Sequence, residues 1–170
     1  TKVRELHGKM FFACVAAEKG FEVTVGGQRE LRERIAEFPP GIYMDKSIAE
    51  TKREWFRKIR LAGHNMCSWD EEGLVVFDAD SHFRLRICRP VLEQARCYFG
   101  WGPSEIGTIA ERAPAAKDRL YPTGNPRFDM LRQELRGFYR EAVDRLRARY
   151  GKILLVNTNF AFANFFAGDE

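Results

Sequence analysis

The sequence predicts an α/β fold, a Rossmann-like parallel sheet with helices packed on both of its faces. Short apolar runs alternate with helical patterns along the chain, and no two runs are joined by a tight hairpin turn. Strands that alternate with helices in this way form parallel sheets, because each helical crossover returns the chain to the same end of the sheet. The length of 170 residues suits one compact domain with a tail, or one half of a two-domain protein.

The composition excludes several classes of protein. With 45% hydrophobic and 31% charged residues, the chain is neither disordered nor fibrous. Its longest apolar runs are far too short to cross a bilayer. The four cysteines form no C-x-x-C pair and the three histidines no H-x-x-x-H pair, so we expect neither a metal site nor another cofactor. Reduced, buried thiols are typical of a cytoplasmic protein.

The first forty residues are predicted to form a helix, a strand and a second helix. Apolar residues at helical spacing predict a helix over residues 3–19. Residues 21–25 are apolar and β-branched at alternate positions, which predicts a strand, and two glycines at 26–27 predict a turn. The next helix is expected over residues 28–38, because the two prolines that follow cannot continue it.

A strand and a capped helix are expected next. The strand covers residues 41–44, and Ser47 is placed to cap the following helix, with Glu50 completing a capping box. Gly63 ends that helix. Its buried face is expected to comprise Ile48, Trp55, Phe56, Ile59 and Ala62.

Four further strands complete the predicted sheet. They cover residues 65–69, 97–101, 119–121 and 153–157, each a short apolar run bounded by polar or glycine-containing segments.

The basic excess of the chain is concentrated near its C-terminal end. The chain has 28 basic and 24 acidic residues, and residues 127–152 contain eight of the basic and four of the acidic ones. The apolar residues of this segment follow a helical stripe, and Glu141 lies four residues before Arg145, as in a surface ion pair. A solvated helix face therefore explains the charge better than an anionic partner, and we expect no nucleic acid binding. The stripe, suited to packing on a sheet, consists of Leu135, Phe138, Tyr139, Ala142, Val143, Leu146 and Tyr150.

Ligands of open parallel sheets bind outside the carboxyl ends of the strands. Four polar segments are expected at that edge of the predicted sheet: residues 3–6, 45–47, 68–73 and 122–129. Two of them, the acidic run at 70–72 and the loop at 122–127, carry residues suited to chemistry.

Asp70, Glu71 and Glu72 form the acidic run that follows a strand. Adjacent carboxylates repel one another, and a partly desolvated one acquires the raised pKa that a general acid or base at neutral pH requires. Glu72 is preferred over Glu71, because Gly73 lets the backbone bend its side chain into a cleft. The alternative interpretation is a solvated acidic turn.

The loop at 122–127 contains Thr-Gly-Asn-Pro-Arg. Gly124 permits a tight turn, and Pro126 suits the first turn of a helix. Arg127 is placed to hold a phosphate or a carboxylate through a bidentate contact. The alternative is a simple helix entry in which Asn125 is the cap.

Five blocks resemble a known family. The Thr-Gly-Asn-Pro-Arg-Phe-Asp segment resembles the CDP-glycerol glycerophosphotransferases, and the whole set is more similar still to bacterial surface carbohydrate biosynthesis proteins. The resemblance spans nearly the whole chain. The blocks, in order, are Lys2–Leu6, Pro39–Ser47, Ser68–Leu74, Tyr121–Arg132 and Lys152–Phe160.

The resemblance implies a GT-B-type architecture of two Rossmann-like domains. Residues 1–150 would form the amino-terminal, acceptor-side domain, and residues 151–170 the start of the donor-nucleotide domain. The strand before Lys2 and the rest of the donor domain would then lie outside this chain, which alone is expected to be inactive.

The function that follows is glycosyl transfer in surface polysaccharide biosynthesis. A nucleotide-sugar or CDP-polyol donor would give a sugar or polyol phosphate to a glycan or lipid-linked acceptor, in the cytoplasm or peripherally at the inner face of the plasma membrane. Glu72 or Glu71 would be catalytic. A nucleotide-sugar epimerase of the same fold and a non-catalytic α/β binding module are the alternatives. The expected substrate-binding residues are Arg4, Glu5, Lys46, Asp70, Asn125, Arg127, Asn157 and Asn159.

Overall fold

A computed structural model of the chain describes residues 3–72 and 78–156, without the side chains of Val3, Arg4 and Ala79. The chain divides into two compact units, residues 1–132 and 133–170. The first unit contains the sheet and the candidate site.

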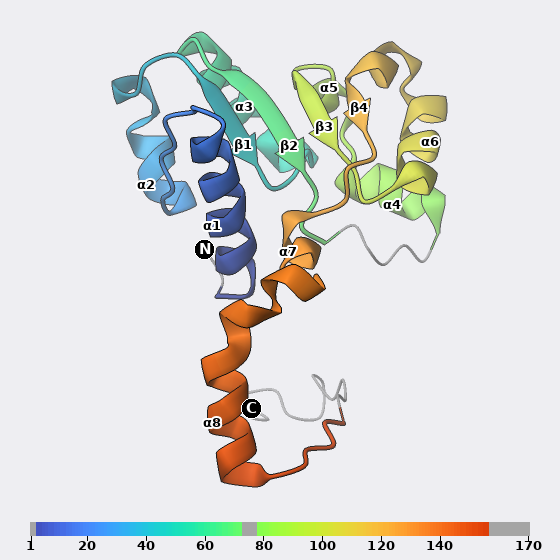
Figure 1. The fold of residues 1–170 in the computed structure, drawn as a ribbon. Coiled ribbons are helices and arrows are strands. Elements are labelled where there is room, and N and C mark those ends of the chain that lie inside the picture. The colour runs from blue at the N-terminus through green and yellow to red at the C-terminus, as the bar shows by residue number, and fades with distance from the viewer. Residues whose placement is uncertain (1–2, 73–77, 157–170) are drawn as a thin grey trace, which may run out of the picture. The chain divides into compact units, whose positions relative to one another are not determined.

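The sheet is parallel, as the sequence predicts. It comprises β1 (Ile42–Asp45), β2 (Asn65–Trp69), β3 (Cys97–Phe99) and β4 (Leu120–Tyr121), in the spatial order β1-β2-β3-β4 (Figure 1). All four carboxyl ends therefore meet at one edge, which is where the polar loops were expected.

The first unit also contains helices and 3₁₀ turns before, between and after the strands. The helices are α1 (Val3–Glu18), α2 (Gln28–Glu33), α3 (Arg53–Leu61), α4 (Ala79–Arg86), α5 (Arg89–Leu92), α6 (Pro103–Arg112) and α7 (Pro126–Asp129). The 3₁₀ turns are η1 (Ile35–Glu37), η2 (Glu50–Lys52) and η3 (Pro114–Arg119).

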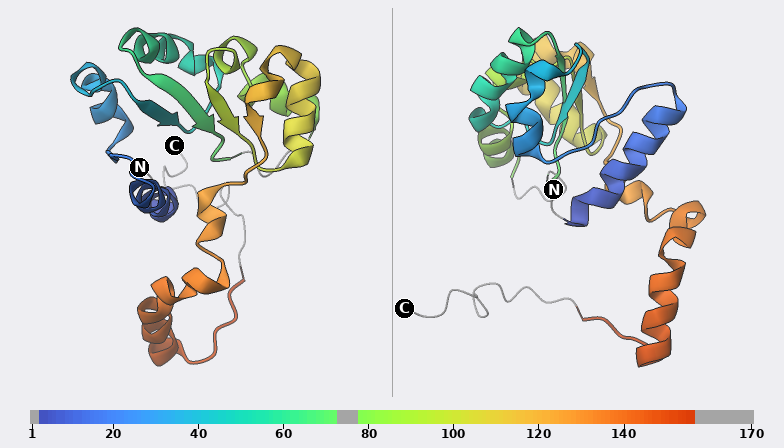
Figure 2. Two further views of the ribbon diagram at one scale, coloured as in Figure 1. Left: turned by 45° about the horizontal axis from the view of Figure 1, so that its top comes forward. Right: turned by 90° about the vertical axis from the view of Figure 1, so that its left-hand side faces the viewer.

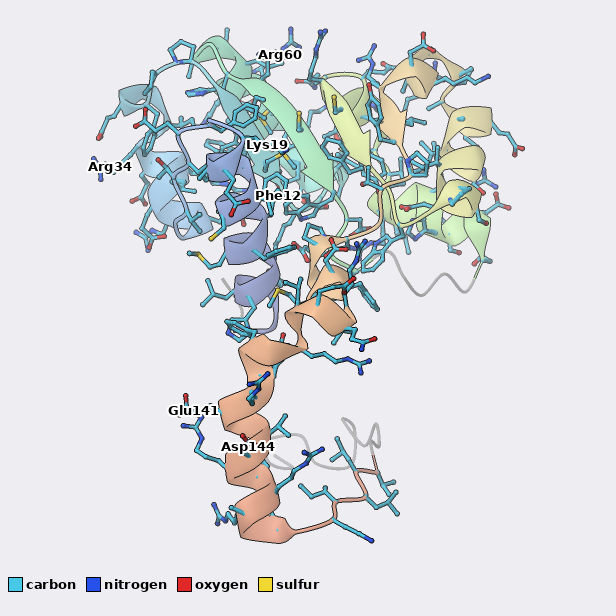
Figure 3. The ribbon with its side chains drawn as sticks, viewed as in Figure 1. Phe12, Lys19, Arg34, Arg60, Glu141 and Asp144 are labelled. Atoms are coloured by element: carbon cyan, nitrogen blue, oxygen red, sulfur yellow. The ribbon has the colours of Figure 1, made fainter. Side chains whose placement is uncertain are left out.

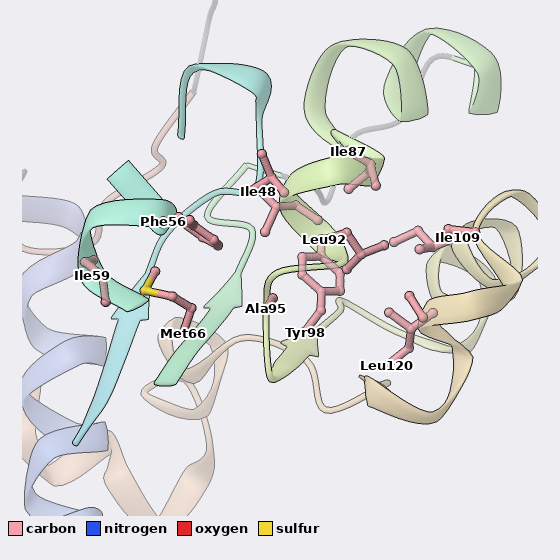
Figure 4. Close-up of a cluster of buried hydrophobic side chains, with 13 residues drawn as sticks. Ile48, Phe56, Ile59, Met66, Ile87, Leu92, Ala95, Tyr98, Ile109 and Leu120 are labelled. Carbon is pink, nitrogen blue, oxygen red and sulfur yellow. The ribbon is translucent and has the colours of Figure 1, made fainter. Parts of the chain in front are cut away.

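The main hydrophobic core lies between one face of the sheet and helices α3, α5 and α6 (Figure 4). Tyr98 of β3 and Phe56 of α3 are fully buried there, and both are large enough to fill the space between the two layers. The core consists of Ile48, Phe56, Ile59, Met66, Ile87, Val91, Leu92, Ala95, Tyr98, Ile109, Ala113, Ala116 and Leu120.

Helix α1 lies on the side of the sheet opposite the core and meets it at the carboxyl end of β2 (Figure 2). Helices on both faces are therefore found only in part, because Ile42 and Tyr121 on that opposite face remain exposed. Successive residues of a strand alternate between faces, so Trp69 points away from the side that Ser68 and Tyr98 share. The ring of Phe12, which is labelled in Figure 3, meets the ring of Trp69 edge to face. The ring centroids are 5.0 Å apart. Aromatic contact thus fixes α1 against the carboxyl end of β2.

The strand expected over residues 21–25 does not form. The segment has no regular secondary structure, and its alternating apolar residues Phe21, Val23 and Val25 remain exposed. Alternation does not form a strand without backbone pairing, and among the described residues β1 pairs with β2 alone, so residues 21–25 do not pair with its other edge.

The capping box expected at Ser47 is also absent. The Ser47 hydroxyl accepts a hydrogen bond from the amide of Ala49 (3.1 Å), so it closes a local turn. The α-helix begins only at Arg53, after the 3₁₀ turn η2. Burial of Ile48, Phe56 and Ile59 is nevertheless as predicted. The helix expected over residues 28–38 is divided into α2 and η1.

The second unit contains a 3₁₀ segment, η4 (Gln133–Tyr139), and helix α8 (Arg140–Tyr150), neither of which has a buried residue. Glu141 pairs with Arg145 at 2.8 Å, as predicted. Residues 153–156 have no regular secondary structure, so the last predicted strand does not form there, and its final residue, Asn157, lies outside the described residues. A strand needs a partner for its backbone groups, and this segment pairs with none of the described strands.

Candidate functional site

Three loops meet at the carboxyl ends of the strands. The amide of Glu71 donates to the carbonyl of Lys46 (3.4 Å), which joins the loops after β2 and β1. The side chain of Asn125 donates to the carbonyl of Asp70 (3.5 Å), and the guanidinium of Arg127 donates to the carbonyl of Glu71 (3.4 Å). The acidic run therefore lies between the other two loops, as the sequence-based placement at one edge requires.

Side chains from these loops and from α1 line one small pocket, together with Gly8 and Pro126. We call its six larger side chains the rim cluster: Glu5, Lys9, Trp69, Glu71, Asn125 and Arg127. The space between these side chains is too small to admit a water molecule. The rim cluster thus forms a wall of polar groups instead of an enclosed ligand cavity.

Glu71 is the buried carboxylate of the rim cluster. It accepts a hydrogen bond from the indole nitrogen of Trp69 (2.7 Å), and the ammonium of Lys9 lies 3.5 Å from it. The same ammonium lies 3.0 Å from Glu5, whose side chain is only 2% exposed. The same ammonium therefore contacts two buried carboxylates.

Glu72 does not line the pocket. Its side chain is about half exposed (52%) and lies 3.3 Å from the guanidinium of Arg86. The preference for Glu72 depended on a bend at Gly73, which lies outside the described residues. Within the described part of the chain, Glu71 is the carboxylate of the acidic run that lines the pocket.

Asp70 is buried, and both of its carboxylate oxygens accept hydrogen bonds. Arg86 donates from Nε to Oδ2 (2.7 Å) and from Nη2 to Oδ1 (2.5 Å), and the amide of Glu72 donates to Oδ1 (3.0 Å). This hydrogen bonding raises the pKa of the Arg86 guanidinium above its usual value. Asp70 therefore fixes the shape of the acidic turn, and it is not exposed to a substrate.

The loop at 122–127 confirms the helix-entry interpretation of Asn125. Its side-chain oxygen accepts from the amide of Arg127 (3.0 Å) and caps α7. Gly124 has φ +78°, which favours glycine, and its amide donates to the carbonyl of Gly100 (2.9 Å). The guanidinium of Arg127 lies 5.8 Å from the rings of Trp101 and Phe128. These two aromatic rings hold the cation of Arg127 at the edge of the rim cluster.

Asn125→Ala is expected to lower the free energy of unfolding by about 1 kcal/mol, the usual effect of removing a helix cap. The variant also loses the donor to Asp70 (3.5 Å). Chemical denaturation of wild type, Asn125→Ala and Asn125→Asp measures the effect. Asn125→Asp keeps the capping oxygen and should lose less than the alanine variant. Equal losses in the two variants would contradict the capping role.

Gly8→Ala is expected to destabilise the chain, although alanine usually improves a helix by up to about 1 kcal/mol. A Cβ at position 8 would lie 2.9 Å from the backbone N and Cα of Arg127, closer than atoms can pack. Helix α1 would have to move away from α7. Thermal unfolding checks the sign, with Gly107→Ala as the control, because nothing lies within 4 Å of a Cβ at that helical position. A higher melting temperature for Gly8→Ala would show that the two helices separate without cost.

Lys46 belongs to a second buried group at the end of β1. Asp45 accepts hydrogen bonds from the amides of Lys46 (2.8 Å) and Ser47 (3.2 Å) and from the ammonium of Lys52 (2.6 Å). Burial lowers the pKa of Lys52, and the attraction of Asp45 opposes this. The Lys46 side chain is half-buried and does not line the pocket.

A third polar group lies beyond the end of β3. Glu105 accepts from the hydroxyl of Tyr98 (2.8 Å) and from the amide of Trp101 (2.6 Å), and burial raises its pKa. His82 lies 3.7 Å from the same carboxylate. Glu105 thus anchors the loop that carries Trp101, next to Arg127.

The predicted site residues are only partly brought together. Glu5, Glu71, Asn125 and Arg127 meet in the rim cluster, whereas Lys46, Asp70 and Glu72 lie beside it. The side chain of Arg4 and both Asn157 and Asn159 lie outside what the structure describes.

Sequence reasoning missed Lys9, Lys52, Arg86 and Glu105. Lys9 could have been found from its i,i+4 spacing after Glu5. The others reach their partners across the tertiary fold, and no local pattern marks them.

Two further findings concern metal sites and membrane-spanning helices in the described residues. In residues 3–72 and 78–156, no three His, Cys, Asp or Glu side chains converge as metal ligands would. None of the helices in those ranges has the length and the apolarity to span a membrane.

No protein-family model matches the chain, and no curated protein or solved structure is similar enough to count as a match.

Proposed function

We propose that the chain is the acceptor-side domain of a GT-B-type glycosyltransferase of surface polysaccharide biosynthesis. The observation that carries the proposal is the position of the rim cluster, which gathers two buried carboxylates and two cations at the carboxyl ends of parallel strands. Ligands of open α/β sheets bind at this edge. The resemblance of five sequence blocks to surface carbohydrate biosynthesis proteins supplies the reaction class.

In the proposed reaction, an acceptor hydroxyl attacks the donor. A bond forms between the hydroxyl oxygen and the transferred sugar carbon or polyol phosphorus, and the bond to the nucleotide leaving group breaks. Glu71 would take the hydroxyl proton, which requires its oxygen to lie about 2.6–3.2 Å from that hydroxyl. Arg127 and Lys9 line the same pocket as Glu71 and would hold anionic parts of the acceptor or donor.

The proposed donor is a nucleotide sugar or a CDP-polyol, and the proposed acceptor is a glycan or a lipid-linked glycan. Such an acceptor would place the protein in the cytoplasm, at the inner face of the plasma membrane. Residues from Lys152 onward would begin the donor-nucleotide domain.

The test is a survey of nucleotide donors with the natural protein that carries this chain. Nucleotide release is measured with each donor, with and without glycan acceptors extracted from the cell surface. The proposal expects release that depends on the acceptor. Isomerisation of a nucleotide sugar without any acceptor would identify an epimerase instead, and no reaction with any donor would contradict the enzymatic function.

A further inference from the structure

Arg86 of α4 is joined to the acidic turn by hydrogen bonds to two of its carboxylates. Its guanidinium donates to both oxygens of Asp70, at 2.7 and 2.5 Å, and to Glu72 at 3.3 Å. The Asp70 side chain is 3% exposed and that of Arg86 32%. A bidentate contact to a buried carboxylate is strong and fixes the relative orientation of its two planar groups.

The turn held by Arg86 is the one that presents Glu71. Asp70 also accepts from the amide of Glu72 (3.0 Å), so the carboxylate fastened by Arg86 determines the direction of the backbone on either side of Glu71. On the other side of the turn, Asn125 and Arg127 donate to the carbonyls of Asp70 and Glu71. Residues 70–72 are thus held between α4 and the loop that precedes α7.

Arg86 makes its contacts from outside the rim cluster. It does not line the pocket, and its partners Asp70 and Glu72 do not line it either. It therefore acts on Glu71 only through the backbone between those two partners. Helix α4 is itself anchored at its start, where Asp78 caps it by accepting from the amide of Ser81 (2.7 Å).

From these contacts we infer that Arg86 is a positioning residue, which sets the orientation of Glu71 for proton transfer. The effect of Arg86 on catalysis rests on the proposed function. Its effect on the structure of the turn rests on the contacts alone. Arg86→Gln removes the charged fork. Arg86→Lys keeps the charge but replaces two parallel contacts by a point charge.

The structural arm of the test uses the 170-residue chain and needs no substrate. Hydrogen exchange of the Glu72 amide is measured in wild type, Arg86→Gln, Arg86→Lys and the control Arg84→Gln, an exposed arginine of the same helix. We expect exchange at Glu72 to accelerate at least about tenfold in Arg86→Gln, less in Arg86→Lys and not at all in Arg84→Gln. Unchanged exchange in Arg86→Gln would overturn the inference.

The catalytic arm uses the natural protein and the same variants. The expected result for Arg86→Gln is a kcat at least about tenfold lower with a KM for the donor within twofold of wild type, partly restored in Arg86→Lys. A general loss of folded protein would instead lower the active fraction equally in both variants. If kcat is unchanged while Glu72 exchange is fast, Arg86 has only a structural role and the inference is overturned. If wild type transfers nothing, the proposed function fails, and the exchange arm alone decides whether Arg86 fixes the turn.

Discussion

Lys52→Met is expected to lower the free energy of unfolding by about 3–5 kcal/mol, the usual cost of leaving one member of a buried ion pair alone. The ammonium of Lys52 lies 2.6 Å from Asp45, whose side chain is fully buried. Methionine fits the space but leaves the Asp45 carboxylate with neutral donors, which are the backbone amides of Lys46 and Ser47 and the side chain of Gln28 (3.5 Å). Chemical denaturation measures the loss.

The double variant Asp45→Asn, Lys52→Met is the control. It removes both charges, and replacing a buried pair by neutral groups is often close to neutral in stability. We therefore expect it to recover most of the loss. If the double variant is as unstable as Lys52→Met, the cost comes from packing around residue 52 and not from an unpaired charge.

The second large effect is expected at Glu71. In the natural protein, Glu71→Gln should lower the rate of acceptor-dependent transfer by about 10²–10⁴-fold, the usual contribution of a general base. Glutamine keeps the size of the side chain and an oxygen that can accept from the Trp69 indole, now 2.7 Å from Glu71. Steady-state kinetics with saturating donor measures the change.

Two comparisons make the Glu71 result specific. Glu72→Gln should have a smaller effect, because Glu72 lies outside the pocket and half exposed. Glu141→Gln, an exposed carboxylate of α8, should have none. Full activity in Glu71→Gln, or equal loss in all three variants, would show that the proton acceptor lies elsewhere.

The fold was predictable wherever local pattern and tertiary pairing agree. Residues 65–69 form a strand with the predicted bounds, and the helix expected over residues 3–19 ends one residue earlier. Residues 21–25 carry an equally good strand pattern but have no partner, so they remain irregular. The capping box at Ser47 has the right residues, yet the hydroxyl is used in a tighter turn. Pairing and local competition of this kind are not visible in a single sequence.

The site was predictable at the level of loops but not of partners. Polar residues after strands located the acidic run and the loop at 122–127 at one edge of the sheet. Which of the three carboxylates lines the pocket depends on Lys9, Trp69 and Arg86, whose contacts form only in the folded chain. The choice between Glu71 and Glu72 therefore required the geometry.

The measurement that tests the central claim most directly is the mapping of acceptor binding on the 170-residue chain. Amide chemical shifts are recorded while an acceptor glycan that supports nucleotide release in the natural protein is added. If the chain is the acceptor-side domain and the rim cluster is its binding surface, the shifts change at Glu71, Asn125 and Arg127 and not at Glu141 or Arg145 on α8. Shifts confined to α8, or no shifts at saturating acceptor, would contradict the claim.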